Sequence, residues 1–210
     1  MAFTHLPLRR SALVGAAAYG LGYLPAYAVA AANRAALADV TVPGATENID
    51  PASLSAVFGS LPPSWTLGGW LFYNAHRAAV SLPAAGARNG VFAPTNTDLI
   101  AALGGSVLGL YLVPPALLVA AGALAMEWGE IGSTTPWVGG ASVAVGYAPL
   151  LVLGSFVFAA SIGDGAVTVV GSPDGLTTLL AALVYPTVFG ALGGALAVRR
   201  RSAEVGTATT

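Results

Sequence analysis

Four long apolar segments without a charged side chain constrain this sequence more than any other feature. They run from Ser11 to Ala32, Leu99 to Met126, Trp137 to Ser161 and Leu176 to Val198, and none contains Lys, Arg, Asp, Glu or His. A helix needs roughly 20 apolar residues to cross the ~30 Å hydrocarbon core of a bilayer. The segments are continuous rather than alternating and about twice as long as a barrel strand, so they predict membrane-spanning helices.

The arginines predict how these helices thread through the membrane. Arg9 and Arg10 precede the first segment and Arg199–Arg201 follow the last, which accounts for five of the eight basic residues. Four spans put both ends on one side, and the positive-inside rule makes that side cytoplasmic. We therefore predict an all-α membrane protein of the cell membrane, with four transmembrane helices, both termini cytoplasmic and a small extracytoplasmic cap between helices one and two. The predicted segments are a cytoplasmic tail (1–10), span one (11–32), the cap (33–98), span two (99–126), a cytoplasmic turn (127–136), span three (137–161), an outer loop (162–175), span four (176–198) and a cytoplasmic tail (199–210). The cytoplasmic turn is bracketed by Trp128 and Trp137 and contains Glu127 and Glu130. The last part of the tail, Ser202 to Thr210, is short and polar, and we expect it to be disordered.

A cleaved signal peptide is the alternative interpretation of the first segment. Leu8-Arg9-Arg10-Ser11 resembles a twin-arginine start, and Ala28-Val29-Ala30 offers small residues for cleavage. The apolar segment is longer than the 7–15 residues usual for a signal core. Its three tyrosines also suit a helix that packs among others, so we favour a retained span.

Each span carries a proline near its middle with a tyrosine one to three residues before it. Gly-Tyr-x-Pro occurs at Gly22–Pro25 and at Gly146–Pro149, while Tyr111 precedes Pro114 and Tyr185 precedes Pro186. Proline removes a backbone donor, and in hydrocarbon the freed carbonyl needs a new partner. We expect kinked helices whose tyrosine hydroxyls, or waters, supply that partner. The candidate ligand-binding residues are therefore Tyr23, Tyr111, Tyr147 and Tyr185.

The repeat of Gly-Tyr-x-Pro has two interpretations. One is a parallel duplication of a two-span unit with a solute path between its halves. The other, which we favour, is that proline and glycine are generally frequent in membrane helices. Small residues four apart predict packing faces, either within the chain or with a protein partner or a second copy. These pairs are Ala18 and Gly22, Gly105 and Gly109, and Gly190 and Gly194.

The connection from Asn33 to Asp98 is too long and too aromatic to be a plain linker. Leu54, Val57 and Phe58 have helical spacing, and Asp39 to Val42 alternates like a short strand. The stretch Trp70 to Arg77 is ambiguous, because Gly68 and Gly69 weaken a helix while the aromatic residues suit a strand. We expect a small folded cap.

The stretch GWLFYNAH, from Gly69 to His76, resembles a segment that recurs in a family of small multi-pass membrane proteins of unknown function from halophilic archaea. The lysine-free, alanine-rich and valine-rich composition is similar to theirs. The resemblance implies one N-terminal span, an outer domain and three later spans. It implies no activity, and it carries over no catalytic residue.

Few polar residues are candidates for chemistry. His76 beside Arg77 is either a pH-sensitive or anion-binding spot or a hydrogen-bonded part of the cap. Asp164 and Asp174 do not have the spacing of a calcium loop, and their Asp-Gly dipeptides are typical of turns. Ser172 and Asp174 are alternatively placed to cap span four.

Ion-coupled pumps place charged side chains inside the membrane, and this chain places none there. With no cysteine, no assembled triad and a net charge of −1, the sequence predicts no catalytic residue, no metal site, no cofactor and no nucleic-acid partner. The expected partners are the lipid bilayer and a protein partner or second copy. The predicted function is a non-enzymatic structural or accessory component of a membrane assembly. The alternative is a small-solute transporter or channel, acting as a homo-oligomer.

Overall fold

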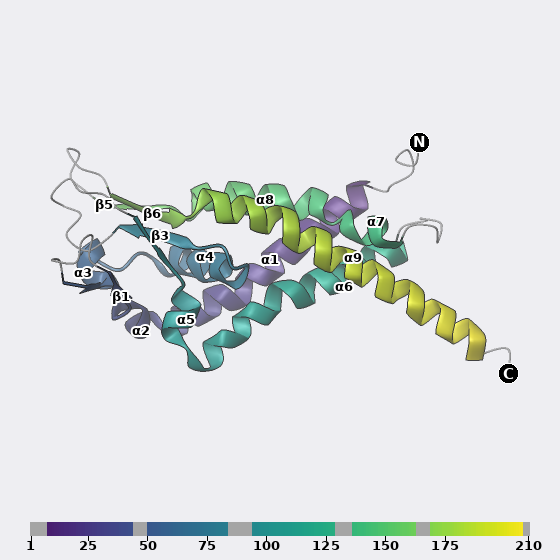
Figure 1. Cartoon of the computed structure of the whole chain (residues 1–210), viewed down its shortest axis with the longest axis horizontal. Coiled ribbons are helices and arrows are strands. Elements are labelled where there is room, and N and C mark those ends of the chain that lie inside the picture. The colour runs from purple at the N-terminus through teal and green to yellow at the C-terminus, as the bar shows by residue number, and fades with distance from the viewer. Residues whose placement is uncertain (1–7, 44–49, 84–93, 129–135, 163–168, 208–210) are drawn as a thin grey trace. The chain divides into compact units, whose positions relative to one another are not determined.

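Four helices are long and apolar enough to cross a membrane in the computed structural model, which describes residues 8–43, 50–83, 94–128, 136–162 and 169–207 (Figure 1). The first is α1 (Leu8–Ala32). The second joins a 3₁₀ helix, η2 (Gly105–Leu112), to α6 (Val113–Trp128), and the third joins α7 (Pro136–Ala141) to α8 (Ala144–Val157). The fourth is α9 (Gly175–Thr207). The four predicted helices are confirmed.

Three predicted boundaries were wrong. Leu99–Leu103 forms a separate short helix, α5, because Gly104 and Gly105 adopt positive φ angles of 63° and 57° that end it before η2 begins. The third helix ends at Val157 rather than Ser161, because Ala160–Ile162 pairs as a strand, β5. Helix α9 continues past Val198 to Thr207, where the sequence predicted a disordered tail.

The chain divides into two compact units. Unit 1 comprises residues 1–22, 112–151 and 180–210, and unit 2 comprises residues 23–111 and 152–179. Helices α1, α8 and α9 contribute residues to both units, whereas the predicted cap lies wholly in unit 2. The remaining described elements of unit 2 are α2 (Arg34–Ala38), β1 (Thr41–Val42), β2 (Ala52–Ser53), α3 (Leu54–Phe58), α4 (Ser64–Ala75), β3 (Val80–Pro83), β4 (Pro94–Thr97) and β6 (Val169–Pro173).

An antiparallel sheet of order β4-β3-β6-β5 joins two distant stretches of the chain (Figure 1). Val80 pairs with Pro173 and Ser81 with Ser172, so the first long connection and the predicted outer loop form one sheet. The prediction of an all-α protein was therefore wrong in unit 2. The prediction failed because each strand is too short to show an alternating pattern. The strands are stabilised by partners far away in the sequence.

Helix α4 is buried along almost its whole length. Every residue from Thr66 to Ala75 is buried, including Trp70 and Tyr73. The ambiguous stretch is a helix because its two glycines allow close packing. A Cβ on Gly68 would lie 2.8 Å from the Tyr27 Cα, and one on Gly69 would overlap atoms of the Phe158 ring. The residues that weaken helix propensity are thus the ones that the packing requires.

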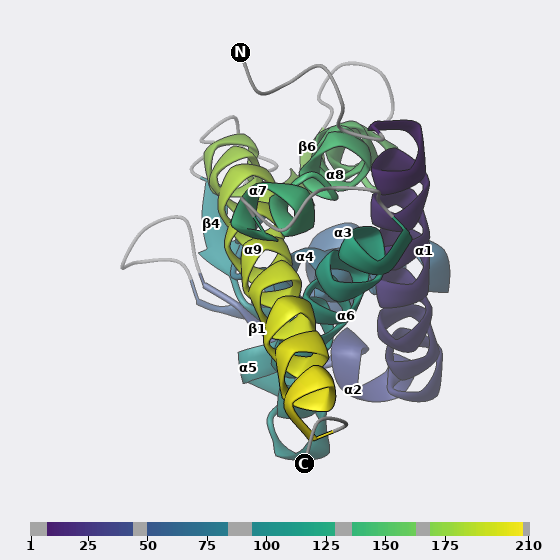
Figure 2. The ribbon, with the colours of Figure 1, turned by 90° about the vertical axis from the view of Figure 1, so that its right-hand side faces the viewer.

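The helices of unit 1 pack backbone to backbone at glycines. A Cβ on Gly146 of α8 would lie 2.7 Å from the Ala12 carbonyl carbon of α1, and one on Gly122 of α6 would lie 2.8 Å from the Gly190 Cα of α9 and closer still to its carbonyl oxygen. Figure 2 shows α6 between α9 and α1. The Gly190 and Gly194 pair is used within the chain, whereas a Cβ on Gly105 or Gly109 would meet nothing within 4 Å.

The two Gly-Tyr-x-Pro motifs occupy different levels of these helices. In the α1–α8 contact, the Ser142 hydroxyl donates to the Ser11 hydroxyl at 2.7 Å, and Gly146 lies against Ala12. Gly22 lies about 15 Å further along α1 than Ala12, at 1.5 Å per residue. A parallel duplication would place the two motifs at the same level, so this register favours the generic explanation of the repeat.

Candidate functional site

The chain leaves helix α4 through a strained residue. Arg77 has a φ of 57°, the one positive φ of a residue other than glycine in the described part of the chain. Its backbone N–H donates to the Asn74 carbonyl at 2.8 Å, which closes the turn that ends the helix. A side chain in this left-handed region is uncommon and costs conformational energy. The surrounding contacts of unit 2 must therefore hold Arg77 in place.

Two residues predicted from the sequence meet at this turn. The Arg77 guanidinium lies 3.8 Å above the centre of the Tyr111 ring, a cation–π contact. The Tyr111 hydroxyl donates to Oδ2 of Asp98 at 2.6 Å, and Oδ1 of Asp98 accepts from the Ala101 N–H at 3.1 Å, which caps α5. We call Asn74, Arg77, Asp98 and Tyr111 the Arg77 site.

Asn74 supports this site from the interior. Its Nδ2 donates to the Ala78 carbonyl at 3.0 Å and to the Thr97 carbonyl at 3.2 Å, while its Oδ1 accepts from the Leu99 N–H at 2.8 Å. One buried amide thus joins the end of α4, the end of β4 and the start of α5. Sequence reasoning missed the roles of Asn74 and Asp98. The signal available was an acidic residue directly before an apolar helix, which is typical of an N-cap.

The structure separates the predicted His76–Arg77 pair. His76 is buried, its Nδ1 lies 2.7 Å from the Phe72 carbonyl oxygen, and its ring packs edge to face on Phe72. Burial lowers the pKa of His76 from 6.5 to about 4, partly offset by the hydrogen bond to Phe72. Arg77 is exposed, and no other described residue forms a hydrogen bond or ion pair with its guanidinium. The arrangement can therefore offer guanidinium N–H groups to an anionic group such as phosphate or carboxylate.

The other candidate tyrosines have separate surroundings. The Tyr23 hydroxyl donates to the Trp65 carbonyl at 3.0 Å, and its ring stacks on Phe158. In unit 1, Tyr147 is buried, packs edge to face on Tyr19 and interacts electrostatically with Tyr185. The hydroxyls of Tyr23 and Tyr111 thus bind groups other than the carbonyls freed by proline.

The acidic residues of the predicted loops have ordinary roles where they are described. Oδ1 of Asp174 accepts from the Thr177 N–H at 2.9 Å and from its hydroxyl at 2.8 Å, which caps α9 as the sequence suggested. Within the described ranges, no group of three or more His, Asp or Glu residues is positioned to hold a metal ion. Asp164, Glu130 and the side chain of Trp128 lie outside the described residues.

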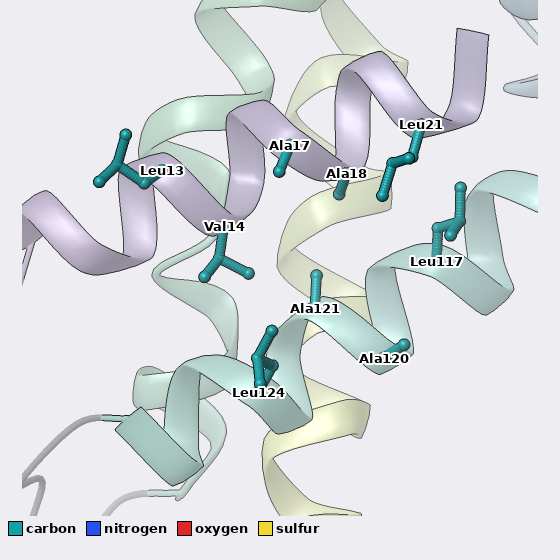
Figure 3. A pocket seen from close by; sticks show the side chains of 9 residues that line it. All are labelled: Leu13, Val14, Ala17, Ala18, Leu21, Leu117, Ala120, Ala121 and Leu124. Atoms are coloured by element: carbon teal, nitrogen blue, oxygen red, sulfur yellow. The ribbon is translucent and has the colours of Figure 1, made fainter. Parts of the chain in front are cut away.

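A hollow lies in unit 1, where α1 and α6 face each other (Figure 3). Its volume is about 490 Å³. We call it the α1–α6 groove. Sequence reasoning missed it, because alanines in the middle of an apolar helix carry no signal of a gap. It is lined by Leu13, Val14, Ala17, Ala18, Leu21, Leu117, Ala120, Ala121 and Leu124.

These features define a mostly helical protein with four helices that are long and apolar enough to span a membrane, and with a strand-containing unit that encloses a buried helix. The chain belongs to the DUF7978 family, a family of unknown function whose model matches residues 3–201. Membership of an uncharacterised family agrees with the resemblance seen in the sequence. No curated protein and no solved structure matches the chain.

Proposed function

We propose that the protein is an integral protein of the cell membrane, with both termini cytoplasmic and residues 33–98, which lie in unit 2, as an extracytoplasmic cap. In this membrane it acts as a non-enzymatic structural or accessory component of an assembly. The observation that carries the proposal is the construction of unit 2. Two connections that are distant in the sequence form one sheet beside a helix, α4, that is buried from Thr66 to Ala75.

This construction suits a rigid platform better than a conduit. The Trp70 Nε1–H donates to the Phe158 carbonyl at 2.8 Å, and Tyr23 and Tyr73 pack against the Phe158 ring. Close-packed aromatic side chains with satisfied polar groups resist deformation. Arg77 is held rigidly at the surface of the same unit, where it offers a charged contact for an acidic partner group.

A small-solute transporter is the second candidate, and one observation favours it. Tyr147 and Tyr185, together with Tyr19, interact within helices that could span the membrane. Hydroxyls gathered among apolar helices are a means of binding a polar solute. Tyr23 and Tyr111 do not support this function, because their hydroxyls bind Trp65 and Asp98.

Purification with a matched pair of variants tests the proposal. The tagged chain, extracted in mild detergent, should retain a protein partner at a fixed molar ratio. Arg77→Gln should release that partner, whereas Asn96→Gln, at an exposed position on β4, should retain it. A chain that purifies alone as a homo-oligomer and conducts a solute in liposomes, with flux lost in Tyr147→Phe, would instead establish the transporter.

The proposed topology has its own test, since the chain contains no cysteine. Single cysteines at Asn96→Cys and Arg200→Cys report the two sides of the membrane. A membrane-impermeant maleimide should label the first in intact cells and the second only after permeabilisation. Leu183→Cys, exposed on α9 within a candidate span, should stay unlabelled in both. Labelling of Asn96→Cys and Arg200→Cys from the same side would contradict the topology.

A further inference from the structure

Three helix pairs in unit 1 make close backbone contact. Gly15 and Gly146 bring α1 and α8 together, Gly140 brings α7 against Gly190 and Gly194 of α9, and Gly193 brings α9 against Val119 of α6. At each of these positions a Cβ would lie within about 3 Å of the neighbouring backbone. Such contacts leave no room between the helices.

The α1–α6 pair differs, because alanines rather than glycines lie between leucines. Val14, Ala18 and Ala121 are almost completely buried and form the floor of the α1–α6 groove, while Leu13 and Leu21 are 72% and 55% exposed and form its rim (Figure 3). Every lining side chain is aliphatic. The groove therefore offers an occupant no hydrogen bond and accepts only hydrocarbon.

The groove has the length and the lining that suit a lipid chain. Leu13 and Leu21 are separated by about 12 Å along α1, at 1.5 Å per residue, and the hollow of about 490 Å³ is lined only by aliphatic side chains. A single acyl chain, extended parallel to the helices, needs no hydrogen-bond partner along this length.

The charges at one end of the groove indicate which lipid. Arg9 and Arg10 are exposed four and three residues before Leu13, which places them about 5–6 Å beyond the groove along α1. Glu127 is exposed three residues after Leu124 on α6, so the two helix ends carry a net charge of +1. Arg199 and Arg200 are exposed near the end of α9 in the same unit. This surplus of positive charge complements an anionic headgroup at the membrane surface.

We infer that the α1–α6 groove is a binding site for one anionic phospholipid, with an acyl chain between the two helices and the phosphate headgroup at Arg9 and Arg10. The inference rests on the proposed membrane location but not on the accessory role. Bound lipid would complete the unit 1 helix packing by filling the space that the alanines leave.

Native mass spectrometry of the full chain tests this site. The protein is released from micelles that contain equal amounts of phosphatidylglycerol and phosphatidylcholine. We expect one retained phosphatidylglycerol per chain. Ala17→Leu and Ala120→Leu, which fill the groove, should abolish the adduct. Ala116→Leu, exposed one turn away on α6 and outside the groove, should keep it and serves as the matched control.

Charge variants test the contribution of the headgroup apart from that of the acyl chain. They leave the packing between the helices unchanged. Arg9→Gln and Arg10→Gln should each lower the preference for phosphatidylglycerol about fivefold, and Glu127→Gln should raise it by a similar factor. A preference unchanged by these three variants would overturn the inference. A lipid adduct that survives both leucine variants would also overturn it. So would a dimer that the leucine variants dissociate, because the occupant of the groove would then be a second copy of the chain. Loss of a co-purifying protein partner would leave the lipid adduct unaffected, so failure of the accessory role is distinguishable.

Discussion

Gly146→Ala offers a sharp test of how closely α1 and α8 pack. The added Cβ would lie 2.7 Å from the carbonyl carbon and 2.8 Å from the Cα of Ala12, and closer still to its carbonyl oxygen. Carbon atoms in favourable contact are about 3.5–4.0 Å apart. Because the opposing atoms belong to the backbone of α1, no side chain can rotate away. The two helices must therefore move apart by about 1 Å.

The expected loss follows from that displacement. Overpacking of a well-packed interior costs about 1–3 kcal/mol, and separation of the helices also lengthens the 2.7 Å hydrogen bond between Ser11 and Ser142, worth roughly 0.6 kcal/mol between membrane helices. The higher helix propensity of alanine returns at most about 1 kcal/mol. We expect a net destabilisation of about 1–2 kcal/mol, measured by reversible unfolding in mixed micelles of mild detergent and dodecyl sulfate.

Gly20→Ala is the matched control on the opposing helix, α1. A Cβ at Gly20 would meet nothing within 4 Å, so this variant should be as stable as the original chain or slightly more so. If both variants unfold alike, the backbone contact between α1 and α8 is absent and the packing argument fails. Ser142→Ala removes only the hydroxyl and should give a smaller loss than Gly146→Ala.

Three further predictions concern unit 2. Burial lowers the pKa of His76 from 6.5 to about 4, so as the pH falls the unfolded chain takes up a proton before the folded chain does. The free energy of unfolding should therefore be constant above pH 7 and fall by about 3 kcal/mol between pH 6.5 and 4. His76→Gln should remove most of this pH dependence. Trp70→Phe should cost about 1–3 kcal/mol in a denaturation titration, since it leaves the buried Phe158 carbonyl without its donor, whereas Trp65→Phe, at a position 43% exposed, should change stability little. Asp98→Ala removes both the cap of α5 and the acceptor of the Tyr111 hydroxyl and should cost about 2–4 kcal/mol; Tyr111→Phe should cost less, and equal losses would show that the cap contributes nothing.

The sequence predicted the long apolar helices, because their conformation follows from the requirements of a hydrocarbon solvent. Segments such as Ser11–Ala32 have one stable conformation in hydrocarbon, because only a helix satisfies their backbone groups internally. The ends of these helices were harder to predict, because contacts with distant parts of the chain determine where each helix stops. Leu99 is as apolar as the span that follows it, and the two positive φ angles at Gly104 and Gly105 are what separate them. Ala160–Ile162 reads as the end of an apolar helix but pairs with β6.

The candidate site was only partly predictable for a related reason. Arg77 and Tyr111 were singled out separately, but their contact depends on Asp98, which the sequence marked only as the edge of a span. For His76 the sequence left two alternatives, a pH-sensitive or anion-binding spot and a hydrogen-bonded part of the cap, and its burial and its contact with the Phe72 carbonyl agree with the second. Neighbouring positions at the end of a helix point in different directions, so adjacency in the sequence did not establish a shared environment.

The pairing of β3 with β6 has a consequence for biosynthesis. A ribosome reaches Val169–Pro173 only after the next two hydrophobic helices have been made, on the order of ten seconds after β4 at about 5–20 residues per second. Until then the nascent hairpin of β3 and β4 has an unpaired strand edge, which can pair with the wrong chain. The sheet of unit 2 is therefore completed only after the third long apolar helix has been made. Slow translation of the intervening helices would prolong the period in which this strand edge is unpaired.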